Sequence, residues 1–217
     1  MSGHASYLVV GRDAEVEIEV RRSRFLATVA RVATEDEARA VVERLRKRHH
    51  DARHHCSAMV VGPPPVPVER SSDDGEPAGT AGAPMLEVLR GAGLSDTVAV
   101  VTRWFGGTLL GAGGLVRAYG DAVRAALEAA GTRERRLLRE VGLEVEHAEA
   151  GRVEGELRSR GVELLDVQWG ASVHLVLGVA PSDDAATRAL LAEVTAGAAE
   201  PVALGERWVD VGGVAGA

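Results

Sequence analysis

The sequence predicts a two-domain α+β protein, and two observations lead to this prediction. The first is a change of charge, because residues 1–139 hold 20 Lys and Arg against 18 Asp and Glu, whereas residues 140–217 hold 5 against 14. The second is the order of elements, because a complete β-α-β-β-α-β pattern begins directly after the basic stretch TRERRLLRE at 132–140. We therefore expect one domain over residues 1–135 and a second over residues 140–217.

The composition is that of a folded protein with an aliphatic core. The 217 residues are 46% hydrophobic and only 3% aromatic, and a chain of this length buries a core without covalent cross-links. Cys56 is the only cysteine, so no intrachain disulfide can form, as is usual in a reducing compartment. No signal-like or membrane-length apolar run is present. We expect a cytoplasmic monomer that does not contact a membrane.

The N-terminal half begins with two strands and a helix. Residues 14–20, AEVEIEV, alternate apolar and polar side chains as a half-buried strand does, and residues 23–32 predict a second strand. Thr34 and Glu37 have the spacing of a capping box at the start of a helix. The apolar face of that helix repeats at helical spacing through Ala38, Val41, Val42 and Leu45, and the helix should end near Arg48.

The rest of this half alternates buried elements with two long loops. Residues 54–61 and 97–104 predict strands, and a short helix is expected over 83–89. Residues 62–84 hold six of the eight prolines and predict a long loop. Half of residues 105–114 are glycine, and a strong amphipathic helix should follow from Leu115, with Gly131 as the residue just after its end.

The C-terminal half has the order of a ferredoxin-like domain. The expected elements, in chain order, are a strand at 141–146, a helix at 148–160, strands at 162–168 and 171–179, a helix at 183–195 and a strand at 203–211.

The first candidate site is the acidic run Asp73, Asp74 and Glu76 in the long loop. Carboxylate oxygens are ligands for Mg²⁺ or Ca²⁺, but the spacing does not match an EF-hand. The favoured interpretation is a turn in which the aspartates accept hydrogen bonds from local backbone amides.

The second candidate site is the glycine-rich loop that joins a buried strand to a helix N-terminus. Backbone amides at such a point bind anions, but glycine also permits tight turns and close packing, and the two interpretations are equally supported. The loop matches neither a P-loop nor a dinucleotide fingerprint. We expect one cleft to combine both candidate sites, with the residues Asp73, Asp74, Gly75, Glu76, Gly79, Thr80, Arg103, Gly106, Gly107, Gly111, Gly113, Gly114 and Arg117.

The histidine-rich segment at 49–56 predicts neither zinc nor catalysis. Neighbouring ligands along a strand point to opposite faces, and no second Cys/His cluster follows. Cys56 is interpreted as a small buried residue rather than a catalytic thiol. No catalytic residue, metal or cofactor is expected.

Basic residues form two runs that can contact nucleic-acid phosphates. The candidates are Arg44, Arg46, Lys47, Arg48, Arg53, Arg133, Arg135 and Arg136. Part of the first run is explained by the preference for basic residues at a helix C-terminus. Because the C-terminal half is acidic, we expect any RNA binding to be salt-sensitive and confined to the N-terminal domain.

Four strings in one order give the sequence a resemblance to a known family. SRF at 23–25, ARHHC at 52–56, SDDGEPAGTAG at 72–82 followed by PML at 84–86, and RWFGG with LGAGGLVRAYG within 103–120 together resemble the IMPACT/YigZ family. The match extends from about Ser23 to Ala130. The C-terminal half resembles the small domain often appended in bacterial members.

The resemblance implies a role in translation. It implies a first domain with the fold of a ribosomal small-subunit protein's second domain, including a left-handed β-α-β crossover, and a second domain shaped like domain V of elongation factor G. Such modules contact ribosomal RNA. The expected function is a regulator that binds RNA, the ribosome or a translation factor without catalysis. The alternatives are a phosphate- or nucleotide-binding protein or enzyme that uses loop 106–114, and a protein-interaction module.

Overall fold

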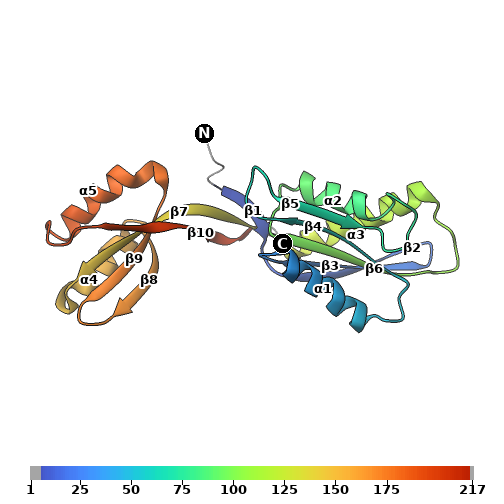
Figure 1. The fold of residues 1–217 in the computed structure, drawn as a ribbon, viewed down its shortest axis with the longest axis horizontal. Coiled ribbons are helices and arrows are strands. Elements are labelled where there is room, and N and C mark those ends of the chain that lie inside the picture. The colour runs from blue at the N-terminus through green and yellow to red at the C-terminus, as the bar shows by residue number, and fades with distance from the viewer. Residues whose placement is uncertain (1–5, 216–217) are drawn as a thin grey trace. The chain divides into compact units, whose positions relative to one another are not determined.

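The computed structural model of the protein describes residues 6–215, which fall into two compact units (Figure 1). The first unit contains the chain up to Arg135 and again from Asp210, and the second contains Arg136–Val209. Strands β7 (Thr132–Val145) and β10 (Val202–Ala215) therefore contribute residues to both units. Each unit combines helices with a sheet, which confirms the predicted α+β class.

The first unit is built on a five-stranded antiparallel sheet in the order β2-β3-β6-β4-β5. Its strands are β2 (Ala14–Val20), β3 (Ser23–Arg31), β4 (His54–Val61), β5 (Val68–Ser72) and β6 (Thr97–Trp104). Strands β3 and β4 both run antiparallel to β6, so they are parallel to each other and are separated by it. Helix α1 (Glu35–Arg48) connects them, which makes a β-α-β unit split by a third strand.

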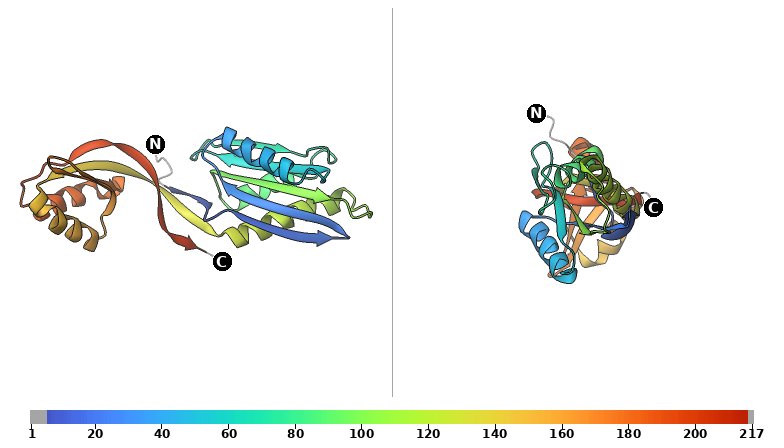
Figure 2. Two further views of the ribbon diagram at one scale, coloured as in Figure 1. Left: turned by 90° about the horizontal axis from the view of Figure 1, so that it is seen from below. Right: turned by 90° about the vertical axis from the view of Figure 1, so that its right-hand side faces the viewer.

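Helices cover both faces of this sheet (Figure 2). Helices α2 (Gly82–Gly91) and α3 (Ala112–Ala130) share a core with Ala99 and Val101 of β6, whereas α1 packs against Val98 and Val100. Successive side chains of a strand point to opposite faces, and β6 is therefore buried on both sides. This explains why the central residues of β6, VAVV at 98–101, are all apolar.

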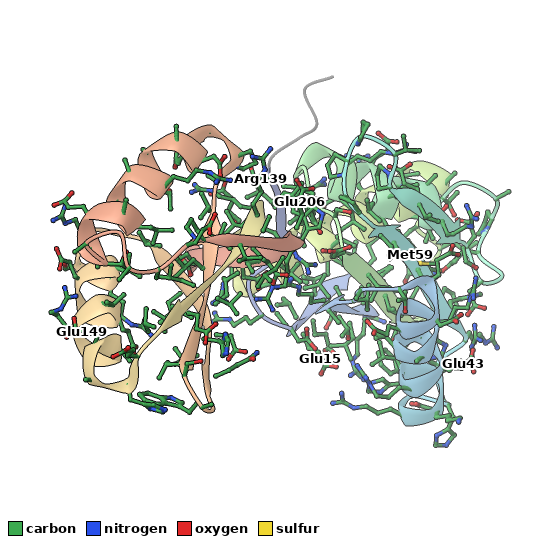
Figure 3. The ribbon with its side chains drawn as sticks, turned by 60° about the vertical axis from the view of Figure 1, so that its left-hand side comes forward. Glu15, Glu43, Met59, Arg139, Glu149 and Glu206 are labelled. Atoms are coloured by element: carbon green, nitrogen blue, oxygen red, sulfur yellow. The ribbon has the colours of Figure 1, made fainter. Side chains whose placement is uncertain are left out.

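Helix α1 begins as the sequence predicts. The Thr34 hydroxyl accepts a hydrogen bond from the Glu37 amide at 3.1 Å, and the Glu37 carboxylate accepts one from the Ala33 amide at 2.6 Å. The return bond of the capping box thus goes to the residue before the N-cap. Figure 3 shows the outcome of the amphipathic pattern, with Glu43 on the exposed side of the helix and Met59 on the sheet that the helix covers.

Three segments differ from the prediction. Residues 6–10 form a short strand, β1 (Ser6–Val10), and residues 68–72 of the predicted long loop form β5. Strand β5 lies at the sheet edge and is largely exposed, so its sequence VERSS lacks the apolar alternation by which strands are recognised. Strand β7 begins at Thr132, within the stretch predicted to be a connection between domains. Its arginines are accommodated there by acidic partners rather than by solvent alone.

The second unit has the predicted β-α-β-β-α-β order. Between β7 and β10 lie α4 (His147–Ser159), β8 (Glu163–Trp169), β9 (Val173–Val179) and α5 (Asp184–Val194). The sheet has the order β1-β7-β9-β8, and β10 also pairs with β7. Its core is formed mainly by leucines and valines of both helices and of the central strands. Independent folding of residues 140–217 remains a prediction for fragment expression. No helix within residues 6–215 is long and apolar enough to cross a membrane.

Candidate functional site

Strand register brings most of the sequence motifs to one end of the first sheet. Phe25 at the start of β3 lies opposite Arg103 at the end of β6, and Arg103 lies opposite His54 at the start of β4. The turn at 21–22, the connection at 49–53 and the glycine-rich loop after Trp104 therefore meet there. We call this region, together with the acidic loop 73–80 that contacts it, the Arg103 end of the sheet.

Asp73 holds the acidic loop in a compact turn through hydrogen bonds to its backbone. Its carboxylate accepts hydrogen bonds from the amides of Gly79, Ala81 and Gly82 at 2.8, 3.0 and 2.8 Å. Desolvation raises the pKa of Asp73, but the three amide donors together outweigh it and hold the pKa below its ordinary value. The favoured sequence interpretation, an aspartate that binds local amides, describes this residue.

Asp74 attaches the same loop to its neighbours. One carboxylate oxygen accepts a hydrogen bond from the Arg46 guanidinium at 2.9 Å, and the other accepts one from the His55 amide at 2.7 Å. Asp74 and Gly75 both have positive φ, at 40° and 84°. The chain therefore makes a tight turn at these two residues, and glycine adopts such a conformation without strain. Thr80 is buried and donates to the Pro77 carbonyl at 2.6 Å.

A buried polar network lies beneath this loop. The Glu76 carboxylate receives hydrogen bonds from the Arg103 guanidinium at 2.5 Å and from the Tyr119 hydroxyl at 2.8 Å. The Glu76 and Arg103 side chains are only 4% and 7% exposed. Another nitrogen of Arg103 lies 3.4 Å from the Ser23 hydroxyl, which also accepts from the Gly106 amide at 3.2 Å. One network thus joins β3, β6, α3 and both candidate loops.

Cys56 belongs to this network as a neutral thiol. It is fully buried, its thiol donates to the Asp73 carbonyl at 3.0 Å, and its sulfur lies 3.3 Å from the Tyr119 oxygen. Burial raises the pKa of Cys56 to about 12 and also raises the pKa of Tyr119 above its ordinary value. Because the thiolate is the nucleophilic form, this cysteine is unsuited to nucleophilic catalysis.

The acidic motif is therefore occupied by the protein's own donors. Asp73 binds amides, Asp74 binds Arg46, and Glu76 binds Arg103. Within the part of the chain that the structure describes, no group of three or more His, Cys, Asp or Glu is placed to hold a metal ion. A general base or metal ligand in this loop would first have to give up an internal bond.

Comparison with known proteins identifies the family to which this chain belongs. The model of the Impact N-terminal domain matches residues 21–127, and residues 143–198 match a domain of unknown function. The chain is 41% identical over 192 residues to IMPACT family member YvyE of Bacillus subtilis, covering 88% of each sequence. The chain belongs to the IMPACT family.

Two further proteins are similar over nearly the whole chain. IMPACT family member YigZ of Escherichia coli is 38% identical over 202 residues, which cover 93% of this chain and 99% of that protein. A crystal structure described as that of a hypothetical protein is 38% identical, with a TM-score of 0.62 over 92% of this chain and 98% of the other.

In this IMPACT family member the Arg103 end presents basic and apolar side chains to solvent. Phe105 is 46% exposed and Leu109 is 82% exposed. Within the described side chains no ion-pair partner is found for five exposed basic residues, which are Arg21, Arg22, Arg44, Lys47 and Arg53. Arg46 and Arg48, also predicted to contact phosphates, pair with Asp74 and Glu15.

The glycines of the loop are present for different reasons. A Cβ on Gly106 would lie 1.9 Å from the Arg22 carbonyl oxygen, and Gly107 and Gly111 have φ of 85° and 73°. Gly114 would bring a Cβ within 3.0 Å of Leu110, whereas a Cβ on Gly113 would meet nothing within 4 Å. Packing and turn geometry thus account for most of these glycines.

Arg117 and Gly79 are brought together in a groove whose lining does not include Arg103. Both line an exposed groove between α2 and α3, together with Ala83, Val88 and Val116 among others. Arg117 is exposed, and the hydrogen bond found for it runs to the Gly113 carbonyl at 3.5 Å. The predicted cleft residues are therefore divided between the closed loop, the buried network and this groove.

The second basic run lies at the opposite end of the sheet. Arg135 pairs with Asp96 at 2.7 Å beside the start of β6, and Arg133 lies 3.8 Å from Asp210. Asp210 also pairs with Arg31, the last residue of β3. Arg136 falls in the second unit. The two predicted runs consequently do not form one patch.

Sequence reasoning did not assign roles to Ser23, Tyr119 or His54. Ser23 and Tyr119 lie 96 positions apart and meet through Arg103 and Glu76, and His54 approaches Glu76 to 4.0 Å. The only signal was their presence inside the strings that carry the family resemblance. Strand pairing was needed to show that these strings converge.

Proposed function

We propose that the protein is a regulator of translation that binds RNA through the Arg103 end of its first unit and catalyses no reaction. The observation that supports this most directly is the group of exposed basic side chains without ion-pair partners among the described residues. The link to translation comes from the family resemblance, which implies modules that contact ribosomal RNA.

Local charge favours phosphate at this end. Residues 21–24 contain three arginines, and residues 44–54 contain five Lys and Arg and one acidic residue, Asp51. The Asp51 carboxylate accepts a hydrogen bond from the Trp104 indole at 2.8 Å, and the three carboxylates of the acidic loop are bound internally. Arg24, Arg46 and Arg48 pair with acidic side chains. The five cations without such partners in the described part of the chain are free to neutralise phosphates, the main source of affinity for RNA.

The buried network supports this role by fixing the loops that carry the exposed groups. Arg103 packs with its guanidinium carbon 5.3 Å from the Phe25 ring centre and 5.8 Å from the Phe105 ring centre. The exposed Phe105 ring is thereby held beside the Arg103 guanidinium, and an unpaired base can stack on such an exposed ring. A surface that is already ordered loses less conformational entropy on binding.

The same observations disfavour catalysis. The candidate carboxylates are engaged, the Cys56 thiol has a raised pKa, and the glycine-rich loop has no adjacent lysine to bind the phosphates of a nucleotide. A thermal-shift screen with ATP, GTP and inorganic phosphate tests the nucleotide-binding alternative. That alternative requires one of these ligands to raise the unfolding temperature of the protein.

The direct test is a fluorescence-anisotropy titration of single-stranded RNA with the full chain at several salt concentrations. If about four phosphates are neutralised, log K falls with log salt at a slope of about −2.8. The double variant Arg21→Gln/Arg22→Gln removes two cations and should change the slope to about −1.4. Arg90→Gln is the matched control, because Arg90 is 46% exposed and pairs with Glu69 and Glu87 on another part of the unit.

Ribosome co-sedimentation provides the second readout. We expect the full chain to pellet with ribosomes at low salt, and the Arg21→Gln/Arg22→Gln variant to pellet less. Binding that is independent of salt, or equal losses in the Arg90→Gln control and the double variant, would contradict RNA binding at the Arg103 end and would favour a protein partner.

A further inference from the structure

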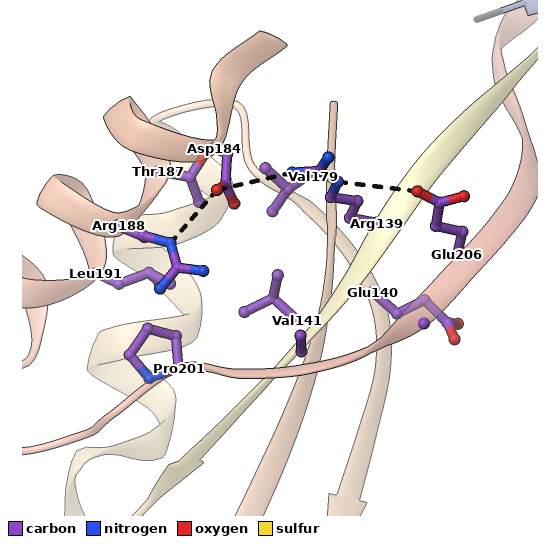
Figure 4. A pocket seen from close by; sticks show the side chains of 12 residues that line it. Arg139, Glu140, Val141, Val179, Asp184, Thr187, Arg188, Leu191, Pro201 and Glu206 are labelled. Atoms are coloured by element: carbon purple, nitrogen blue, oxygen red, sulfur yellow. Dashed lines mark hydrogen bonds and ion pairs between the residues drawn. The ribbon is translucent and has the colours of Figure 1, made fainter. Parts of the chain in front are cut away.

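The second unit contains a cavity that the RNA-binding proposal does not use. Figure 4 shows it between α5 and the strands β7, β9 and β10, with a volume of about 430 Å³. Its floor is apolar and is formed by Val141, Val179, Leu191 and Pro201. Small-molecule sites occupy roughly 300–1,000 Å³ and combine such floors with a few polar groups.

Four ionised side chains surround the opening of this cavity. Arg139 lies 3.7 Å from Asp184 and 3.8 Å from Glu206, and Arg188 lies 3.4 Å from Asp184. These distances are longer than those of a close charged hydrogen bond, about 2.7–2.9 Å. The guanidinium groups therefore retain donor capacity, and Figure 4 shows Arg139 and Arg188 among the residues that line the cavity.

A fifth ionised group of the cavity is already engaged. The Glu140 carboxylate forms an ion pair with the Arg207 guanidinium at 2.7 Å. Two cations and two anions remain at the opening, so their formal charges balance. A ligand that carries one positive and one negative group complements this arrangement, whereas a ligand with a single charge leaves like charges unpaired.

We propose that this cavity binds a zwitterionic small molecule with an apolar side chain, of the α-amino acid class. The ligand carboxylate contacts Arg139 and Arg188, and its ammonium group contacts Asp184 and Glu206. Its side chain packs on Val141, Val179 and Leu191. This assignment does not depend on RNA binding, because every residue that lines the cavity belongs to the second unit.

The charge of the unit argues against a simple anion as ligand. Residues 136–209 contain seven arginines and 13 acidic residues, and a phosphate or a fatty acid would meet a repulsive field there. A simple cation would be attracted by the unit as a whole, but it would bring no anion for the two arginines at the opening.

The test is a titration of the full chain, by calorimetry and by methyl NMR, with L-leucine, L-methionine and L-phenylalanine. Glycine serves as the probe without a side chain. 3-Methylbutylamine and 4-methylpentanoate are leucine without its carboxylate or its amine. We expect an apolar amino acid to bind at least about tenfold more tightly than glycine, because its side chain is buried. Each singly charged analogue should lose about tenfold or more, and shifts should appear at the Leu191 and Val179 methyls.

A matched pair of variants locates the site. Arg188→Gln removes a cation at the opening, and Arg158→Gln removes an arginine of α4 with similar exposure, 61% against 57%, and the same i,i+4 pairing with one carboxylate. We expect a loss of about tenfold or more for Arg188→Gln and none for Arg158→Gln, with both variants unfolding at the wild-type temperature.

Three results would overturn the proposal. They are the absence of binding tighter than about 10 mM for every apolar amino acid tested, equal binding of L-leucine and its singly charged analogues, and equal losses in the two arginine variants.

Discussion

Replacing Glu76 by Gln is expected to destabilise the first unit strongly. The Glu76 and Arg103 side chains are 4% and 7% exposed and lie 2.5 Å apart. Glutamine preserves the shape and still accepts a hydrogen bond from Tyr119, but it leaves the Arg103 guanidinium as a buried charge without its anion. Breaking a buried pair in this way costs about 3–5 kcal/mol, a large part of the roughly 5–15 kcal/mol by which domains are stable.

The assay is urea denaturation followed by the fluorescence of Trp104, which lies at the end of β6 in the first unit. The other two tryptophans, Trp169 and Trp208, fall in Arg136–Val209, and replacing both by Phe makes the signal specific. With a slope of about 1–3 kcal/mol per molar urea, a loss of 3 kcal/mol lowers the midpoint by about 1 M or more. The exposed pair provides the control, because Glu43→Gln beside Arg46 should cost about 0.5 kcal/mol or less.

A double variant tests the reasoning rather than the magnitude. Glu76→Gln/Arg103→Met removes both charges, so it should be less destabilised than the sum of its two single variants. The explanation would be refuted by a loss below about 1 kcal/mol for Glu76→Gln, or by a double variant at least as unstable as the sum. Either result would mean that Arg103 obtains solvent or another anion when Glu76 is neutral.

Three further predictions concern the same end of the sheet, and a fourth concerns its binding. Gly106→Ala should lower the unfolding midpoint sharply, because its Cβ would lie 1.9 Å from the Arg22 carbonyl oxygen; thermal denaturation of the variant checks this. The pKa of Asp73 is lowered in the folded protein, so its contribution to stability is complete above the ordinary carboxyl pKa and is lost as pH falls through the lowered value. The difference in unfolding free energy between wild type and Asp73→Asn should therefore be larger at pH 7 than at pH 3. Because the pKa of Cys56 is raised to about 12, a thiol reagent should label the native protein slowly at pH 8 and quickly in denaturant; fast native labelling would show that the site opens. RNA should bind residues 1–139 more tightly than the full chain in the same anisotropy titration, since the acidic half is removed.

Local patterns in the sequence were sufficient for the elements whose environment repeats regularly. Strand β6 was predicted because both of its faces are buried, and α1 was predicted from its cap and its apolar stripe. Strand β5 was missed because an exposed edge strand has no such pattern. Strand β7 was missed at its start because acidic partners from distant parts of the chain accommodate its arginines.

The sequence was sufficient to predict the two loops of the candidate site, but not the contacts between them. The sequence identified the acidic loop and the glycine-rich loop, and it favoured amide binding by the aspartates, as Asp73 shows. The sequence did not show that the three carboxylates of the acidic loop have different partners. Glu76 differs from Asp73 because a buried arginine from another strand reaches it, and only the register of the sheet brings that arginine there.

The return of the chain to the first unit at Asp210 has a consequence for synthesis. Asp210 pairs with Arg31 of β3 and lies 3.8 Å from Arg133, so Arg31 obtains a partner that lies 179 positions later in the chain. The first unit cannot acquire these ion pairs until the whole second unit has left the ribosome. A nascent chain stalled between the two, or a transcript truncated before codon 210, would therefore present a first unit whose Arg31 and Arg133 lack this carboxylate.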